Sequence, residues 1–150
     1  MNQNQTQSKP ESAEQPSPEG LDATPCSPCL AYLAIPYSHP DPLIREERFR
    51  AVNRVAARLM AGGMHVFSPI SHTHPIAVEG DLPRGWEYWE AYDRVMLKAC
   101  QKLIVLKLDG WDKSVGVAGE IAIAQELGIE VEYLENDKVR DGESGPHATK

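Results

Sequence analysis

Short apolar runs and longer stretches with helical spacing alternate through the central part of the chain. Four apolar runs have the length of strands: 30–35, 65–69, 102–108 and 129–134. Continuous apolar runs of this kind are typical of strands buried on both faces of a parallel sheet. Between them, apolar residues three and four positions apart predict helices. These helices cover about 41–62, 86–99 and 114–127.

Start and stop residues support the helix boundaries. Asp41 can cap the first helix, and Pro42 suits its first turn. Gly62 ends that helix, and Gly128 ends the last one. The stretch ISHTHPIAVEGDLPRG, residues 70–85, has no clear periodicity and is predicted to be a loop.

The order of strands and helices predicts an α/β fold of the Rossmann-like or flavodoxin-like kind. Its parallel sheet has four to five strands, with helices on both faces. In such sheets ligands bind beyond the carboxyl ends of the strands. Three segments that follow strands should therefore meet there: IPYSHP, SPISHTHP and LDGWDKSVG.

The two ends of the 150-residue chain differ from its middle. Residues 1–29 hold almost no large aliphatic side chains, and residues 136–150 are also polar. We expect two disordered tails around one domain at 30–135. No segment resembles a membrane span or a secretory signal, which predicts a cytoplasmic protein without a membrane partner. The net charge of −7 argues against a nucleic acid polymer as partner.

Cysteine and histidine spacing completes no metal site. Cys26 and Cys29 form a C-x-x-C motif in the N-terminal tail, without the second pair that a zinc site needs. On an extended chain, His72 and His74 would point the same way. A metal-dependent hydrolase that uses these two histidines is therefore an alternative function. No carboxylate stands at a suitable spacing, so we expect neither a metal nor a cofactor.

Two carboxylates interrupt apolar helical faces. Glu120 shares a face with Ile123 and Ala124, and Asp93 lies on a face with Leu97. A solvated glutamate and a structural aspartate would explain them one at a time. Together they offer the pair that glycosidic cleavage needs, one group to attack the sugar and one to handle the proton of the leaving group.

The start of the last predicted helix is suited to an anion. Gly116 and Gly119 leave room for a ligand near the backbone. Free amide groups and the Ser114 hydroxyl lie at the same place. A phosphate group and a carboxylate one to two turns apart indicate a site for a phosphorylated sugar.

These motifs resemble the nucleoside 2-deoxyribosyltransferase-like superfamily, which includes the transferases and the 2′-deoxynucleoside 5′-phosphate N-hydrolases. The resemblance covers about residues 30–134. It rests on AYLAIPYS in the first strand, a helical aspartate after a loop, the strand KLIVL and the motif S-x-G-V-x-x-E at 114–120. The chain is most similar to an uncharacterised bacterial family within this superfamily.

The resemblance implies roles for particular residues. Glu120 takes the place of the nucleophile at C1′ of the sugar, and Asp93 acts on the substrate beside it. Tyr32 supports the glutamate, with Tyr37 as the alternative. Ser114 stands where the hydrolases have a serine that contacts phosphate, which implies a 5′-phosphorylated substrate.

Further contacts with the substrate are expected around this centre. The expected substrate-binding residues are Ser114, Gly116, Pro36, Tyr37, Ser38, His72 and His74. Where some relatives have an arginine after the first strand, this chain has Ser38, and Arg45 or Arg48 could substitute. One of the tryptophans could stack on the base: Trp86, Trp89 or Trp111.

The sequence thus predicts cleavage or transfer at the N-glycosidic bond of a (deoxy)nucleoside or its 5′-monophosphate, without a cofactor. The resemblance also implies a homo-oligomer. The main alternative is a non-catalytic nucleotide-binding module on the same fold, because a fold does not determine a function.

Overall fold

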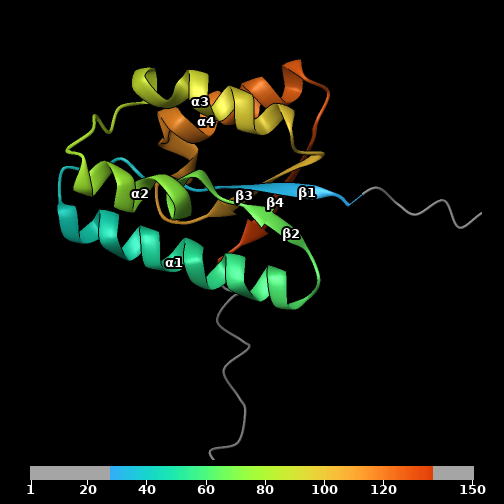
Figure 1. Ribbon diagram of the computed structural model, residues 1–150, viewed down its shortest axis with the longest axis horizontal. Helices are drawn as coiled ribbons and strands as arrows, with labels where there is room; N and C mark the ends of the chain where they lie inside the picture. The colour runs from blue at the N-terminus through green and yellow to red at the C-terminus, as the bar shows by residue number, and fades with distance from the viewer. Residues whose placement is uncertain (1–27, 137–150) are drawn as a thin grey trace, which may run out of the picture.

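Four parallel strands form the central sheet of the computed structural model, which describes residues 28–136 (Figure 1). The strands are β1 (Leu30–Ala34), β2 (His65–Phe67), β3 (Lys102–Lys107) and β4 (Glu130–Glu135). Their order in the sheet is β2-β1-β3-β4, and each neighbouring pair is parallel. The predicted Rossmann-like or flavodoxin-like α/β fold is confirmed.

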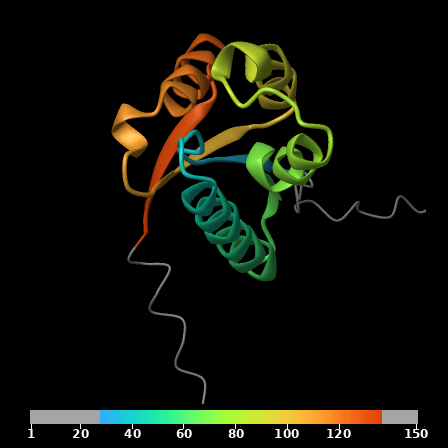
Figure 2. The same ribbon diagram turned by 90° about the vertical axis from the view of Figure 1, so that its left-hand side faces the viewer.

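Helices cover both faces of this sheet. They are α1 (Pro42–Ala61), α2 (Pro69–Glu79), α3 (Trp86–Lys98) and α4 (Val115–Glu126), with a short 3-10 turn, η1 (Trp111–Lys113). The helix α1 lies on one face, and α3 and α4 lie side by side on the other (Figures 1 and 2). The helix α2 packs against α1 and β1.

The central strand β1 is buried on both faces, and its side chains alternate between two apolar cores. Leu33 packs with Val52 and Val55 on the α1 side. Tyr32 packs with Leu97 on the side of α3 and α4. Because successive side chains of a strand point to opposite faces, the position of Tyr32 in β1 directs its hydroxyl toward α3 and α4.

The strand order creates a crevice at one edge of the sheet. From β1 the chain crosses to β2 on one side, and after β2 it returns to β3 on the other side of β1. Such a reversal opens a crevice at the carboxyl ends of β1 and β3. The three segments expected to meet there do so, because Tyr37, Pro69 and Ser114 line one cavity.

The loop predicted for residues 70–85 is wrong over its first half, where α2 runs from Pro69 to Glu79. The Ser68 hydroxyl accepts a hydrogen bond from the backbone N–H of Ser71 at 3.4 Å, and Pro69 occupies the first turn. A serine followed by proline is a helix start signal. Pro75 inside the helix, which lacks an N–H, obscured this signal.

The helix changes the arrangement of its two histidines. Residues two apart on a helix point about 200° away from each other. His74 is buried and faces the cavity, whereas His72 is exposed. The expectation that these two side chains point the same way, on which the metal-dependent alternative rested, is therefore wrong.

The predicted tails fall mostly outside the part of the chain that the structure describes. Residues 1–27, with Cys26, and residues 137–150 lie outside it. Among residues 28–136, no helix is both long and apolar enough to cross a bilayer.

Close contact between α3 and α4 depends on a glycine. A Cβ atom added to Gly119 would lie 2.2 Å from the Trp86 ring, which is far inside contact distance. The ring of Trp86 therefore lies directly on the α4 backbone. This contact brings α3 close to the first turns of α4, where the candidate site lies.

We predict that Gly119→Ala lowers the free energy of unfolding by about 1–3 kcal/mol, because the added methyl group overpacks against Trp86. Without this clash, alanine would stabilise the helix by about 0.5–1 kcal/mol relative to glycine. A decrease in the free energy of unfolding would therefore indicate the clash with Trp86. Urea denaturation followed by tryptophan fluorescence measures the effect.

Gly116→Ala on the same helix is the matched control. Its Cβ would meet the Ser114 hydroxyl at 3.8 Å and Trp86 at 3.9 Å, which are ordinary contacts. This variant should be as stable as the wild type or more stable. Equal stability of the two variants would contradict the packing argument.

Candidate active site

A cavity of about 590 Å³, counted to its open mouth, lies at the carboxyl ends of β1 and β3. Its walls come from the loop after β1, from α2 and α3, and from the start of α4. The lining residues are Ile35, Tyr37, Ser38, Pro69, Ile70, Thr73, His74, Ala77, Arg84, Trp86, Trp89, Asp93, Ser114, Gly116 and Glu120.

Glu120 lines this cavity and is buried, with only 5% of its surface exposed. The Tyr32 hydroxyl donates a hydrogen bond to Oε1 of Glu120 at 2.8 Å. Tyr32 comes from the central strand and is itself fully buried. Of the two tyrosines that the sequence offered as support for Glu120, the geometry thus selects Tyr32.

Asp93 reaches the same cavity from α3 and is also buried. Its Oδ1 atom has no hydrogen-bond partner among the described residues. Buried carboxylate oxygens are normally satisfied, so an unpaired one facing a cavity is suited to a donor on a ligand. The expectation that the two acids converge on one cavity is met.

Burial favours the protonated form of both acids. It raises the pKa of Asp93 from 3.8 to about 6. Burial, and next the charge of Asp93, raise the pKa of Glu120 well above its usual value, while the hydrogen bond from Tyr32 lowers it. The pair therefore retains a proton at a pH where exposed carboxyls are ionised. Burial and the two acids also raise the pKa of Tyr32, which stays a neutral donor.

A second, more basic hollow adjoins the cavity at the start of α4. Both hollows share Ser38, Trp86, Ser114 and Gly116. The second is also lined by Pro36, Arg48, Gly85, Glu87, Gly110, Lys113 and Val115. The Ser114 hydroxyl caps α4 by accepting a hydrogen bond from the N–H of Val117 at 3.3 Å, so its own proton is available to a ligand.

The other expected substrate contacts divide into two groups. Tyr37 and His74 face the cavity together, and the Tyr37 hydroxyl lies 2.6 Å from Nδ1 of His74. Ser38 lines both hollows and donates a hydrogen bond to the backbone oxygen of Arg84 at 3.1 Å. His72 lines neither hollow, and its ring lies beside that of Tyr92.

Of the arginines and tryptophans that the sequence offered, some line the two hollows and others do not. Arg48 lines the basic hollow and donates hydrogen bonds to the backbone oxygens of Ser38 and Asp109. Arg45 instead binds the backbone oxygens of His39 and Pro40, and it lines neither hollow. Trp86 and Trp89 line the cavity, whereas Trp111 packs against Tyr133.

Sequence reasoning missed several residues of the cavity. Ile70, Thr73 and Ala77 face it from α2, at the spacing of one helical face. That spacing was a signal for them, once α2 was recognised. Arg84 also lines the cavity, and its Nε is buried without a hydrogen-bond partner among the described residues. No motif indicated Arg84.

The described residues contain no cluster of three or more histidine, cysteine, aspartate or glutamate side chains arranged to hold a metal ion. The polar groups of the cavity include two carboxyls, a histidine, a tyrosine hydroxyl, an arginine and the hydroxyls of two serines and a threonine. Such a set can attack an electrophilic carbon, exchange protons and bind an anion.

The fold and the site define a class: an α/β protein with a flavodoxin-like sheet and a buried carboxylate pair beyond the carboxyl ends of its strands. Residues 29–136 match the family described as "Domain of unknown function (DUF1937)", and the chain belongs to this family. A comparison with curated proteins finds no match. The expectation of an uncharacterised family is confirmed, whereas the link to the nucleoside 2-deoxyribosyltransferase-like superfamily stays a prediction.

We predict that Asp93→Asn stabilises the protein at pH 7.5. The folded state binds the Asp93 proton more tightly than the unfolded chain, so the free energy of unfolding falls as the pH rises from about 4 to about 6. A pKa shift from 3.8 to about 6 corresponds to at most about 3 kcal/mol. Asparagine removes this cost, and urea denaturation at a series of pH values measures the gain.

Asp112→Asn, at an exposed position, is the control and should change stability little. The gain of Asp93→Asn should shrink toward pH 4, where the wild-type carboxyl is protonated in the folded state. A variant that is less stable than the wild type at pH 7.5 would show that the ionised carboxylate is structurally required.

Proposed function

We propose that the protein cleaves the N-glycosidic bond of a (deoxy)nucleoside 5′-monophosphate, or transfers its sugar, with Glu120 as the nucleophile. The observation that carries this proposal is the pair of buried carboxyls at one cavity, with Glu120 held by Tyr32. The resemblance to the nucleoside 2-deoxyribosyltransferase-like superfamily, carried by the motif at 114–120, supports it independently.

In the proposed reaction, the proton that Glu120 holds in the free protein moves to Asp93 once the substrate is bound, which leaves Glu120 ionised. Positive charge develops on the sugar as the glycosidic bond weakens, and this charge favours the Glu120 carboxylate. The hydrogen bond from Tyr32 favours the same form. Neutral Asp93 beside it can then donate a hydrogen bond to a sugar hydroxyl.

The bond changes follow the retaining pattern of glycoside cleavage. An oxygen of Glu120 forms a bond to C1′, and the C1′–N bond breaks with its electron pair going to the base. The base takes up a proton and leaves. Water, or a second base, then attacks C1′ from the side that the first base left, and the Glu120 carboxylate is regenerated.

The basic hollow is the proposed binding site of the 5′-phosphate. Arg48 and Lys113 supply positive charge there, and the Ser114 hydroxyl supplies a donor. The first amide groups of α4 have no acceptor within the helix and suit an anion. The base, in this arrangement, lies against the apolar wall formed by Ile70 and Ala77 of α2.

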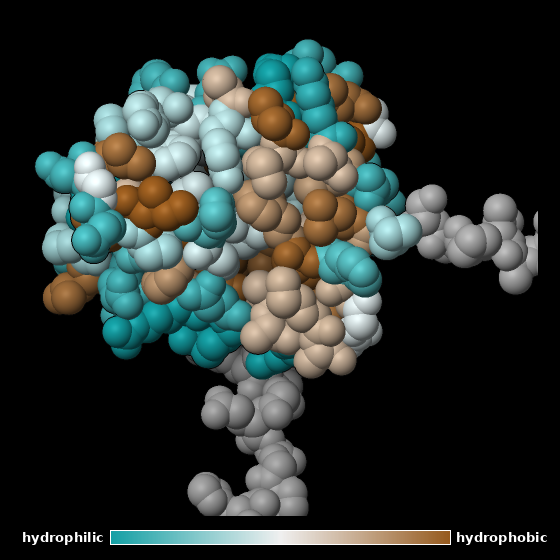
Figure 3. Space-filling model, viewed as in Figure 1, coloured by the Kyte–Doolittle hydropathy of each residue, from teal (hydrophilic) through white to brown (hydrophobic). Residues whose placement is uncertain are grey.

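A homo-oligomer is part of the proposal. Large apolar side chains are exposed on α2 and α3, among them Ile76, Val78 and Val95. Figure 3 shows apolar side chains gathered on part of one face of the molecule. Such patches are typical of interaction surfaces.

We predict that Glu120→Gln lowers base release by more than about 10³-fold, because an amide cannot act as the nucleophile. The isosteric glutamine can still accept the hydrogen bond from Tyr32, so nucleotide binding should change only a few-fold. Chromatography of reactions with a panel of nucleosides and 5′-monophosphates measures released base, and calorimetry measures binding.

Glu126→Gln, at an exposed position on the same helix, is the control and should keep full activity. A wild-type protein that binds nucleotides but releases no base from any of them would instead be a nucleotide-binding module. Unchanged turnover by Glu120→Gln would remove Glu120 from the nucleophile position.

A separate prediction concerns the phosphate. Lys113→Ala should raise KM for a 5′-monophosphate about tenfold, the effect of losing one partly screened charge contact of about 1.4 kcal/mol. KM for the matching nucleoside should not change. Lys98 lies outside both hollows, so Lys98→Ala is the control and should leave KM for both substrates unchanged. Steady-state kinetics with the two substrates measures both values; an equal effect on both would contradict the assignment.

A further inference from the structure

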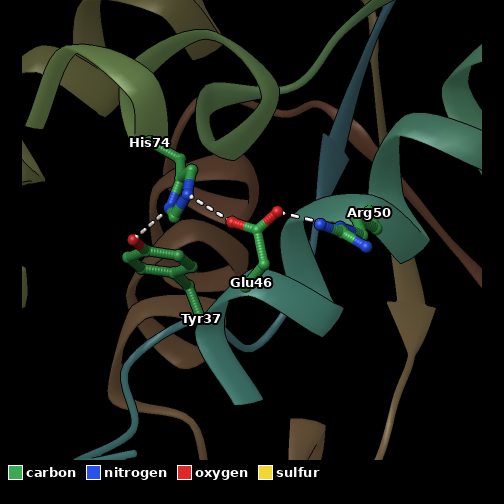
Figure 4. A network of polar contacts seen from close by, with 4 residues as sticks. All are labelled: Tyr37, Glu46, Arg50 and His74. Carbon is green, nitrogen blue, oxygen red and sulfur yellow. Dashed lines mark hydrogen bonds and ion pairs between the residues drawn. The ribbon is translucent and has the colours of Figure 1, made fainter. Parts of the chain in front are cut away.

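A chain of polar contacts connects the cavity to the surface on the side of α2 (Figure 4). The Tyr37 hydroxyl lies 2.6 Å from Nδ1 of His74, and Nε2 of His74 lies 3.2 Å from Oε2 of Glu46. Arg50 then donates a hydrogen bond to the other carboxylate oxygen of Glu46 at 2.9 Å. The chain begins at two cavity residues and reaches the surface at Glu46, whose side chain is 39% exposed.

The His74 ring is fixed in one orientation. Phe49 of α1 stacks on it, with ring centroids 4.3 Å apart, and both ring nitrogens have polar neighbours. Arg50, followed by His74, lowers the pKa of Glu46, so Glu46 is an acceptor. Nε2 of His74 therefore carries a proton toward Glu46, and only Nδ1 differs between the neutral and the protonated ring.

The state of Nδ1 determines what Tyr37 offers to a ligand. When His74 is neutral, Nδ1 accepts the proton of the Tyr37 hydroxyl, and Tyr37 can only accept a hydrogen bond from the cavity. When His74 is protonated, Nδ1 donates to the Tyr37 oxygen, and the hydroxyl proton can point into the cavity. Tyr37 can therefore give a proton to a ligand and replace it from His74.

Position separates Tyr37 from the carboxylate pair. Asp93 and Glu120 come from α3 and α4, whereas Tyr37 and His74 come from the loop after β1 and from α2. The charged groups that act on Tyr37 are Arg45, Arg84 and Glu46, and neither acid of the pair is among them. Tyr37 and the pair thus line the cavity from different elements.

A displacement at C1′ needs its proton donor on the side of the leaving group. Glu120 attacks C1′ from one face, so the base departs from the opposite face. Asp93 lies beside the nucleophile, within the influence of the same Tyr32 hydroxyl. In the proposed binding mode the base lies against α2, the helix that also carries His74.

We propose that Tyr37 gives the proton to the departing base and that His74, oriented by Glu46, replaces this proton. The proposal rests on the proposed function and names the acid that it leaves open. It moves the proton donor from the neighbourhood of Asp93, where the sequence predicted it, to the loop after β1 and α2.

Protons and electrons balance in this step. As the C1′–N bond breaks, its electron pair goes to the base, and a ring nitrogen of the base takes the proton of the Tyr37 hydroxyl. The proton on Nδ1 of His74 moves to the Tyr37 oxygen, which leaves His74 neutral with Nε2–H still donated to Glu46. When water attacks C1′, it gives a proton back along the same path, since an acid in one half of such a reaction is the base in the other.

The surroundings of Tyr37 suit a proton carrier. Burial and the Glu46 charge raise the pKa of Tyr37, and Arg45 and Arg84 lower it, with a raised value as the result. The hydroxyl therefore keeps its proton at neutral pH until a base is ready to accept it.

The test compares two leaving groups on the same sugar phosphate. One substrate is a purine or pyrimidine 2′-deoxyribonucleoside 5′-monophosphate that the wild type cleaves. The other carries a 4-nitrophenoxy group in place of the base. This group departs as the 4-nitrophenolate anion and needs no proton. Tyr37→Phe and His74→Gln should lower base release about 10²- to 10⁴-fold, the usual contribution of a general acid. Both should release nitrophenolate within about threefold of the wild-type rate, which also shows that they are folded.

Matched variants separate proton donation from structure. Glu46 is a positioning residue, and Glu46→Gln should lower base release about tenfold without affecting nitrophenolate release, a selective loss that damage to packing would not produce. Glu47→Gln and Tyr133→Phe, at exposed positions outside the cavity, should change neither rate. Glu120→Gln should lose both reactions, and Asp93→Asn should affect both to the same extent.

Each outcome decides between the proposals. If Tyr37→Phe loses both reactions equally, or neither, the relay is overturned while the role of Glu120 stands. If Asp93→Asn shows the leaving-group-selective loss, the acid is Asp93. If the wild type releases neither base nor nitrophenolate, the proposed function fails and the relay fails with it.

Discussion

The hydrogen bond from Tyr32 to Glu120 is the contact on which the arrangement of the site depends. It joins the central strand to the first turns of α4, and both side chains are buried. A carboxyl group taken out of water without a donor is costly, so this bond makes the position of Glu120 tolerable. It exists only because the alternation of β1 directs Tyr32 to the same side of the sheet as α4.

The packing of α3 on α4 determines how close the second acid comes. Because Gly119 has no side chain, the Trp86 ring lies on the α4 backbone, and Asp93, two turns further along α3, reaches the cavity of Glu120. Proximity and burial then raise the pKa values of both acids. The absence of a side chain at Gly119 thus contributes to the raised pKa values of Asp93 and Glu120. The stability lost by burying this pair is characteristic of sites that are kept for reactivity rather than for packing.

The sequence predicted the fold because its signals are local. Apolar runs, helix caps and glycine stops each lie within a few residues of the element that they define, and Asp41 indeed caps α1. The convergence of Glu120 and Asp93 was predictable because each interrupts an apolar face and the parallel sheet brings both to one edge. The helix α2 was missed because Pro75 conflicts with its start signal, Ser68-Pro69. The contact of Glu46 with His74 and the place of Arg84 in the cavity were not predictable, because the first joins residues 28 apart in the chain and the second depends on loop geometry.

Because the sequence prediction did not include the helix α2, it also misjudged the arrangement of the two histidines on that helix. On an extended chain His72 and His74 form a pair, and a pair of histidines suggests a metal. On a helix only His74 reaches the cavity, where it meets Tyr37 from the loop after β1 and Glu46 from α1. Three elements thus converge on one imidazole, and no spacing in the sequence encodes that convergence. The cavity consequently has two chemically different parts, one with the two buried acids and one with a chain of polar contacts that leads to the surface. In the proposed reaction, Glu120 attacks the sugar from the part of the cavity with the two acids, and the base departs toward the part with Tyr37 and His74. The reaction therefore uses both parts.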